Sequence, residues 1–221
     1  MGVNIAIDGP AGAGKSTIAK KIAKKLGYIY VDTGAMYRAM ALYLLREQIL
    51  PSETEKIDEK CREADISIGY ENGEQIVYLN GENVNGLIRT EEVGNMASAS
   101  SPNPNVRAKL VELQRKLASD KDVVMDGRDI GTCVLPDAQV KVYLTADSSV
   151  RAGRRYRELE EKGVPCSLLE IEKDIIERDR QDMTREISPL RQAADAVLVD
   201  SSHMTIEEAA DAVIALLQRE R

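Results

Sequence analysis

The chain has 221 residues, of which 43% are hydrophobic and 30% charged, a composition typical of a globular protein. The longest uninterrupted apolar run covers only 39–45, whereas a membrane helix needs about 20 such residues, so no membrane-spanning segment is predicted. The net charge of −7 argues against general nucleic-acid binding, because a basic surface supplies most of the affinity in that class. The few cysteines form no CxxC pair, which argues against a zinc site or a disulfide framework and favours a reducing cytoplasm.

The N-terminal part of the chain alternates between strands and helices. Its apolar pattern predicts strands over 3–7 and 28–31 and helices over 14–26 and 35–46. Gly27 is expected to close the first helix, and Asp32 is placed to cap the second. Strand-helix-strand-helix order over so short a stretch is typical of a parallel α/β sheet.

The alternation breaks in the middle of the chain. A polar helix is predicted over 52–64, and two Asn-Gly pairs, 72–73 and 80–81, predict tight hairpin turns between short antiparallel strands. We therefore expect a small inserted β subdomain over 63–97. A helix over 106–118 follows two prolines.

The α/β pattern then resumes and completes a sheet of five core strands. The predicted elements are strands over 123–125, 139–144 and 196–199 and helices over 148–162 and 167–182. Capping boxes at Ser167 and at Thr205 begin the second of these helices and a last one. The only histidine, His203, precedes the last helix, and we expect it in a surface loop, which argues against a Ser-His-Asp triad or a multi-histidine metal site.

A phosphate-binding loop joins the first strand to the first helix. The segment from Gly9 to Ser16 matches G-x-x-x-x-G-K-[ST] in full, and its buried strand and amphipathic helix are the context that this motif requires. Backbone N–H groups of the glycine-rich turn and the helix N-terminus are expected to hold phosphates, with Lys15 on the β- and γ-phosphates and Ser16 on Mg²⁺. The predicted ATP-binding residues are Gly9, Pro10, Ala11, Gly12, Ala13, Gly14, Lys15, Ser16 and Thr17.

Three classes of P-loop protein are compatible with this motif. A GTPase switch needs an N-K-x-D motif, which the chain lacks, and a motor ATPase usually needs a longer chain. A small-molecule kinase needs a second phosphate pocket with arginines, and eight arginines fall within 151–191. Some of these arginines could equally lie on a solvated helix face and form i,i+4 ion pairs. Two alternative functions therefore stay open: another P-loop small-molecule kinase, and a P-loop ATPase or switch module.

Three further motifs resemble bacterial cytidylate kinases, which belong to the nucleoside monophosphate kinases. They are Val31-Asp-Thr-Gly-Ala-Met-Tyr-Arg38, Asp126-Gly-Arg-Asp-Ile-Gly-Thr132 and Glu177-Arg-Asp with the later Arg185 and Ser188-Pro-Leu190. The resemblance covers essentially the whole chain. It implies an α/β P-loop NTPase fold of the nucleoside monophosphate kinase type, with a five-stranded parallel core sheet, a small antiparallel β insertion and a helical lid. The implied divisions are a core over 1–62, 98–147 and 184–221, an NMP-binding insertion over 63–97 and a lid over 148–183.

The resemblance also implies a reaction and a set of site residues. The reaction is phosphoryl transfer from ATP to CMP or dCMP with Mg²⁺. From the composition we further predict a cytoplasmic monomer that binds neither nucleic acid nor membrane. The implied catalytic residues are Lys15, Arg38, Arg128, Arg154 and Arg155, and Asp126 is expected to hold Mg²⁺ through water together with Ser16. The implied CMP-binding residues are Asp32, Thr33, Tyr37, Arg38, Ser98, Arg107, Arg128, Asp129, Arg178, Asp182 and Arg185.

Several of these residues also have an ordinary structural interpretation. Asp32 is equally placed to act only as a helix cap, and Tyr37 to pack. Arg178 and Asp182 share one helix face, either to clamp the ribose hydroxyls or to form an i,i+4 ion pair. In the resemblance Arg38 and Arg128 contact phosphate, Asp129 reads the cytosine amino group, and Ser98, Arg107 and Arg185 lie near the base.

Overall fold

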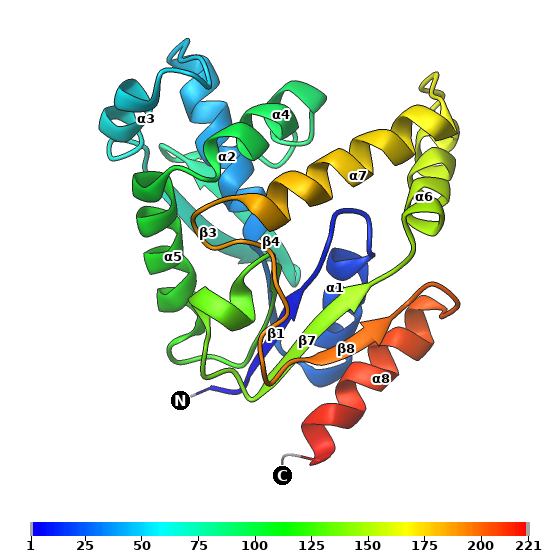
Figure 1. Cartoon of the computed structure of the whole chain (residues 1–221). Helices are drawn as coiled ribbons and strands as arrows, with labels where there is room; N and C mark the ends of the chain where they lie inside the picture. Colours follow the sequence, from blue (N-terminus) through cyan, green and yellow to red (C-terminus); the bar gives the residue numbers. More distant parts are fainter. Residues whose placement is uncertain (1, 220–221) are drawn as a thin grey trace. The chain divides into compact units, whose positions relative to one another are not determined.

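The computed structural model of the chain describes residues 2–219, which form two compact units (Figure 1). Unit 1 comprises Gly2 and 29–122, and unit 2 comprises 3–28 and 123–219. The two units are defined by which residues pack compactly with one another. The predicted division into core, insertion and lid is a functional one and stays a prediction.

Unit 2 is built on parallel strands that begin at the first residues of the chain. Strand β1 (Asn4–Asp8) pairs in parallel with β6 (Val123–Gly127) and with β7 (Val140–Thr145), and β7 pairs in parallel with β8 (Val197–Asp200). The order of the large sheet is β2-β6-β1-β7-β8, where β2 (Ile29–Asp32) belongs to unit 1. The predicted five-stranded core sheet is therefore confirmed.

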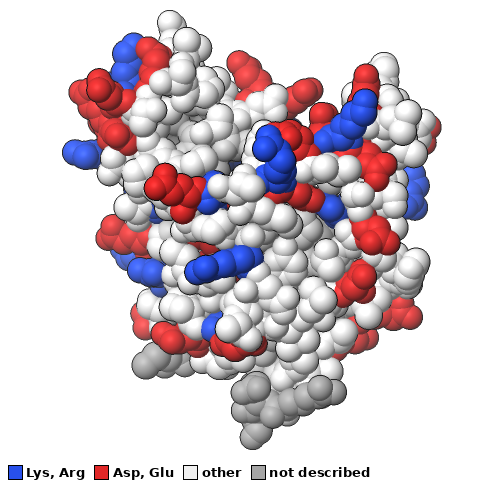
Figure 2. Space-filling view, in the orientation of Figure 1, with Lys and Arg blue, Asp and Glu red and all other residues white. Residues whose placement is uncertain are grey.

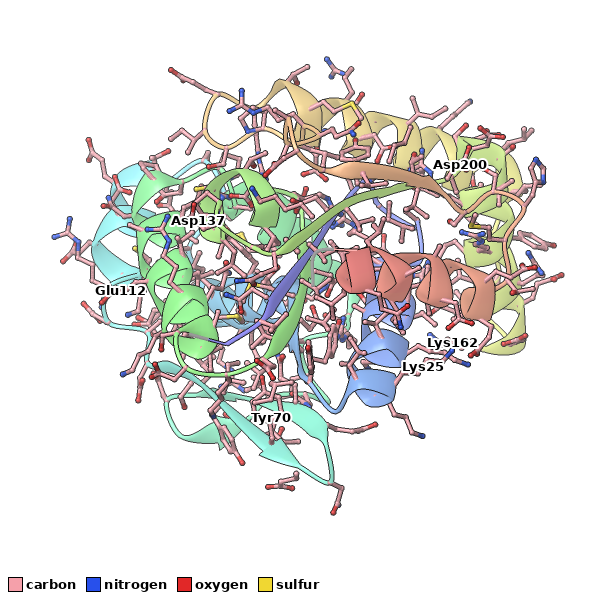
Figure 3. All side chains as sticks on the ribbon, turned by 90° about the horizontal axis from the view of Figure 1, so that it is seen from below. Lys25, Tyr70, Glu112, Asp137, Lys162 and Asp200 are labelled. Carbon is pink, nitrogen blue, oxygen red and sulfur yellow. The ribbon has the colours of Figure 1, made fainter. Side chains whose placement is uncertain are left out.

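Helices of unit 2 cover this sheet and extend from it. Helix α1 (Lys15–Leu26) follows β1, and α8 (Ile206–Arg219) packs beside it. Lys25, labelled in Figure 3, lies near the end of α1 and donates to Asp211 of α8 at 2.6 Å. Helices α6 (Ser148–Glu161) and α7 (Leu168–Thr184) pack against each other as a hairpin. Ile5, Ile7, Ile22 and Met125 are fully buried in the core of this unit.

Unit 1 contains the small antiparallel sheet that the two Asn-Gly pairs predict. Strands β3 (Ile66–Glu71), β4 (Glu74–Leu79) and β5 (Glu82–Asn83) are adjacent and antiparallel. The residues of both Asn-Gly pairs have positive φ, as two-residue hairpin turns require. The predicted β insertion is confirmed.

The helices of unit 1 depart from the predicted ones at two places. They are α2 (Thr33–Arg46), α3 (Thr54–Lys60), α4 (Glu91–Ser100) and α5 (Pro104–Ala118). Helix α3 is shorter than the predicted 52–64, and α4 occupies the end of a segment expected to be β structure. Helix α4 mixes strong helix formers (two Glu, one Met and two Ala) with weak ones (Gly94, Asn95 and two Ser), and it packs against α2.

A short π-helix, η1 (Ile130–Val134), follows β6 and was not predicted. In the C-terminal part of unit 2, Thr205 and Glu208 form the expected capping box, and His203 is exposed in a turn as predicted. Among residues 2–219, no helix combines the length and the apolar character needed to cross a membrane.

Candidate functional site

The phosphate loop lies between β1 and α1, where the sequence places it. Its glycines at positions 9, 12 and 14 all have positive φ, a conformation that side chains with a Cβ rarely adopt. The loop thereby turns sharply from the carboxyl end of β1 into the first turn of α1. That edge of a parallel sheet is where ligands bind in open α/β folds.

Lys15 is buried at the base of this loop, and its Nζ donates to the carbonyl oxygen of Pro10 at 2.7 Å. Burial, and less strongly the nearby Arg128 guanidinium, lower the pKa of Lys15 to about 7, although the carboxylates of Asp126 and Asp182 act in the opposite direction. A bound polyphosphate would supply the negative charge that favours the protonated amine. The Lys15 amine would therefore take up a proton, and become positively charged, when a polyphosphate binds.

Ser16, in the first turn of α1, lies next to Asp126, near the carboxyl end of β6. Ser16 Oγ donates to Oδ2 of Asp126 at 2.9 Å, and Asp126 is buried at the end of β6. Two adjacent oxygen donors fit Mg²⁺, which binds through few protein ligands and completes its shell with waters and phosphate oxygens. No group of three or more His, Cys, Asp or Glu among residues 2–219 is placed to hold a metal.

A cavity of about 940 Å³ opens around the phosphate loop within unit 2. Its walls come from Lys15 and its neighbours, from the arginines of α6 and α7, and from the loop before α8. Arg154 donates to the carbonyl oxygen of Ser201 at 2.7 Å, and Arg155 pairs with Glu158 at 2.8 Å. The stretch 201–206 was not predicted as part of the site, because it has no motif and only the tertiary structure brings it to the phosphate loop.

The residues of unit 2 that were predicted to bind the acceptor form a buried charge cluster. Arg128 Nε donates to Asp182 at 2.7 Å, and Arg185 lies 3.7 Å from Asp182 and 3.8 Å from Asp129. Burial acts to raise the pKa of Asp182, but the Arg128 guanidinium and, less strongly, Arg185 hold it below its ordinary value. Arg178 lines the cavity.

Asp8 is a functional candidate that sequence reasoning missed. Its carboxylate accepts hydrogen bonds from the N–H groups of Ile130 and Gly131, both at 2.7 Å, at the start of η1. Burial raises its pKa to about 6, although these two backbone donors act in the opposite direction. Asp8 immediately precedes the phosphate loop, and η1 immediately follows Arg128 and Asp129. The carboxylate therefore holds the two segments of unit 2 in fixed register.

In unit 1, Asp32 does act as the predicted helix cap. Its Oδ1 accepts from the N–H group of Ala35 at 2.9 Å, and its Oδ2 accepts from Arg89 at 2.6 Å. Its backbone exchanges two hydrogen bonds with the Gln75 side chain. Thr33 is buried beside it. Both carboxylate oxygens thus already have structural partners, so part of its role is to fix the start of α2.

The other predicted residues of unit 1 surround α2 and α4. Arg38 donates to the carbonyl oxygens of Ile88 and Thr90, at 3.1 Å and 3.4 Å. The Arg107 guanidinium lies 5.8 Å from the centre of the Tyr37 ring, within cation–π range. Ser98 is half-buried on α4, the helix that packs on α2. The predicted acceptor set is therefore divided between the units, and each part is assembled within its own unit.

The parallel sheet, the phosphate loop at its carboxyl edge and the Ser16–Asp126 pair define a P-loop phosphotransferase fold. Two solved structures are similar. The shikimate kinase from Bacteroides thetaiotaomicron has a TM-score of 0.50 and 14% identity, with 98% of each chain covered. The shikimate kinase from Acinetobacter baumannii has a TM-score of 0.50 and 16% identity, over all of this chain and 96% of that one. At such identities the likeness concerns the fold alone.

Sequence comparison is more specific. The family described as cytidylate kinase matches residues 5–219. A cytidylate kinase of Caldicellulosiruptor saccharolyticus is 52% identical, with 98% of this chain and 96% of that protein covered. Those of Desulfitobacterium hafniense and Lactobacillus gasseri are 49% and 47% identical, over 97% and 99% of this chain and 92% and 95% of theirs. The chain belongs to the cytidylate kinase family, which confirms the resemblance predicted from its motifs.

Proposed function

We propose that this protein transfers the γ-phosphoryl group of ATP to CMP or dCMP, giving ADP and CDP or dCDP. The observation that carries the proposal is the arrangement of Lys15 and the Ser16–Asp126 pair beside Arg128, in a chain of the cytidylate kinase family. In the reaction, an oxygen of the acceptor α-phosphate forms a bond to the γ-phosphorus. The bond from that phosphorus to the bridging oxygen of the β-phosphate breaks, and ADP leaves with the electron pair.

The chain's own residues act mainly by positioning and by offsetting charge. The acceptor phosphate is already a nucleophile near neutral pH, so no general base is required. Lys15, Arg128, Arg154 and Arg155 all line the same cavity and supply positive charge to the transferring group. The α6–α7 hairpin, which carries the last two arginines, is the proposed lid over 148–183 and would exclude water.

Ser16 and Asp126 are the residues that would hold Mg²⁺. The ion neutralises phosphate charge when it is bound with ATP. Ser16 Oγ supplies a neutral oxygen, and Asp126 supplies a buried carboxylate that can accept hydrogen bonds from metal-bound waters. Residues of the stretch 201–206 also line the cavity, and we assign this stretch to the adenosine part of ATP.

Recognition of the acceptor rests on the hydrogen-bonding pattern of cytosine. Its N4 amino group is a donor, which suits the Asp129 carboxylate, and its N3 and O2 are acceptors, which suit the guanidinium groups of Arg107 and Arg185. Arg38 supplies charge for the acceptor phosphate, and Asp182 with Arg178 suits the ribose hydroxyls. The part of the proposed acceptor site that lies in unit 1 is completed by Asp32, Thr33, Tyr37 and Ser98.

The proposed partners are small molecules, and the proposed form is a cytoplasmic monomer. On the face shown in Figure 2, basic and acidic side chains are interspersed rather than gathered by sign. This face therefore offers no broad basic surface of the kind that holds nucleic acid.

A coupled assay of ADP release tests the proposal. We expect rapid ADP release with CMP or dCMP, and slow release with UMP, AMP, shikimate or no acceptor. Preference for shikimate would assign the chain to another P-loop kinase activity. ADP release that no acceptor accelerates would favour an ATPase or switch module instead.

A further inference from the structure

A buried ion pair outside the predicted site connects the phosphate loop to both helices of the α6–α7 hairpin. Arg151 of α6 and Asp179 of α7 lie 2.6 Å apart, between Nη1 and Oδ2. The two residues are only 6% and 8% exposed. We call them the anchor pair.

The anchor pair holds the phosphate loop at Ala11 through both of its backbone polar groups. Asp179 Oδ1 accepts from the Ala11 N–H group at 3.2 Å, and Arg151 Nη1 donates to the Ala11 carbonyl oxygen at 2.8 Å. Arg151 Nε also donates to the carbonyl oxygen of Ala146, directly after β7, at 2.8 Å. Each side chain thus has fixed partners on the loop, so the loop cannot change shape without breaking buried charged hydrogen bonds.

Close packing supports this connection. Gly12 has a φ of +74°, and a Cβ built on it would lie 3.3 Å from Cβ of Arg151 and 3.8 Å from Cδ1 of Ile175. The loop therefore approaches both helices closely at the position next to Ala11. One turn along α6 from Arg151, Arg154 lines the cavity, and Arg178 does so next to Asp179.

A pair of this kind contributes little to stability when compared with apolar groups of similar volume. Desolvation of two buried charges offsets their attraction, and well-packed apolar replacements are often neutral or stabilising. The anchor pair does, however, affect the geometry of the phosphate loop. It fixes backbone atoms of this loop, whose N–H groups must already point inward to bind phosphate.

We propose that Arg151 and Asp179 are positioning residues. They hold the phosphate loop in the conformation that binds ATP, and they hold the cavity arginines of the α6–α7 hairpin close to that loop. The inference rests on the proposed ATP binding at this loop. It predicts that loss of the anchor pair weakens ATP binding much more than binding of the acceptor.

The test compares Asp179→Asn with Glu177→Gln on the same helix. Glu177 pairs with Arg180 at 2.8 Å, but these side chains are 49% and 67% exposed, so the matched control removes a solvated pair. We expect Asp179→Asn to raise the KM for ATP and the Kd for a non-hydrolysable ATP analogue about tenfold or more. The KM for CMP should stay within about twofold, and Glu177→Gln should leave all three constants unchanged.

The double variant Arg151→Met with Asp179→Leu separates positioning from stability. An apolar pair can replace a buried ion pair in a protein core, so we expect the double variant to fold. It should fold even if Asp179→Asn, which leaves the Arg151 charge buried without its partner, does not. Its affinity for the ATP analogue should still be weakened, since neither side chain can bind Ala11. Wild-type affinity in this variant, or equal rises in both KM values in Asp179→Asn, would overturn the inference. A wild-type chain that binds no ATP analogue would instead overturn the proposed function.

Discussion

Ser16 and Asp126 are 110 residues apart in the chain, yet Ser16 Oγ donates to Asp126 Oδ2 at 2.9 Å. The sheet register explains the contact. β1 and β6 are parallel neighbours, with Ile7 opposite Asp126, so the residues that follow β1 and those that end β6 meet at one edge. The pair places a hydroxyl and a carboxylate together directly beside the phosphate loop.

Ser16→Ala should weaken the response to Mg²⁺ while the fold persists. The variant removes one of the two protein oxygens of the proposed metal site, so the Mg²⁺ concentration for half-maximal activity should rise about 10–100-fold. Titration of activity with Mg²⁺ at saturating ATP measures this shift. Ser119→Ala, in an exposed turn, is the control. An unchanged Mg²⁺ requirement in Ser16→Ala would remove Ser16 from the metal site.

Binding of ATP should be accompanied by proton uptake at Lys15. In the free protein the pKa of Lys15 is lowered from 10.5 to about 7, so the amine is largely neutral above that pH, whereas adjacent phosphates favour its charged form. Affinity for ATP with Mg²⁺ should therefore fall as the pH rises through about 7. Calorimetry at about pH 8 in buffers of different ionisation enthalpy measures the uptake. Lys15→Met should abolish it, and equal uptake by wild type and variant would contradict the assignment.

Gly94→Ala should impair use of CMP without lowering stability. Helix α4 passes so close to Arg38 that a Cβ on Gly94 would lie 3.0 Å from its Nη1, and the guanidinium must move. Alanine in a helix interior is favoured over glycine by about 1 kcal/mol, so the free energy of unfolding should be unchanged or higher. The KM for CMP should rise about tenfold.

The control for this variant is Gly153→Ala in α6, where a Cβ meets no atom within 4 Å. Its free energy of unfolding should likewise be unchanged or higher, and its KM for CMP should be unchanged. Steady-state kinetics and denaturant unfolding of both variants provide the measurements. A normal KM for CMP in Gly94→Ala would show that the position of Arg38 does not matter to the acceptor.

Asp129→Asn should reduce discrimination between CMP and UMP. Uracil presents an acceptor at O4 where cytosine presents an amino donor, and a buried carboxylate rejects the acceptor. The wild-type chain should favour CMP in kcat/KM by about 10²–10⁴-fold, and the variant should narrow that ratio by harming CMP more than UMP. The exposed Asp137→Asn is the control. Equal losses for both nucleotides would mean that Asp129 maintains the site without reading the base.

The sequence by itself determined the local features of this protein. Apolar runs of strand length, the three-and-four spacing of α1, and the Asn-Gly turns at 72–73 and 80–81 are visible because each depends on residues a few positions apart. The phosphate loop is visible for the same reason, since its glycines, Lys15 and Ser16 are contiguous. The selective motifs around Arg38 and Arg128 were sufficient to predict the family.

Only the tertiary structure decided what distant residues do together. Helix α4 interrupts its helix formers with Gly94 and Asn95 and packs against α2, and η1 begins where the Asp8 carboxylate accepts hydrogen bonds from two backbone N–H groups. Arg151 and Asp179 resemble ordinary residues of charged helices until folding buries them against Ala11. The physical reason is that burial and hydrogen bonding across more than a hundred residues depend on strand order and helix packing, which leave no periodic signal in the sequence.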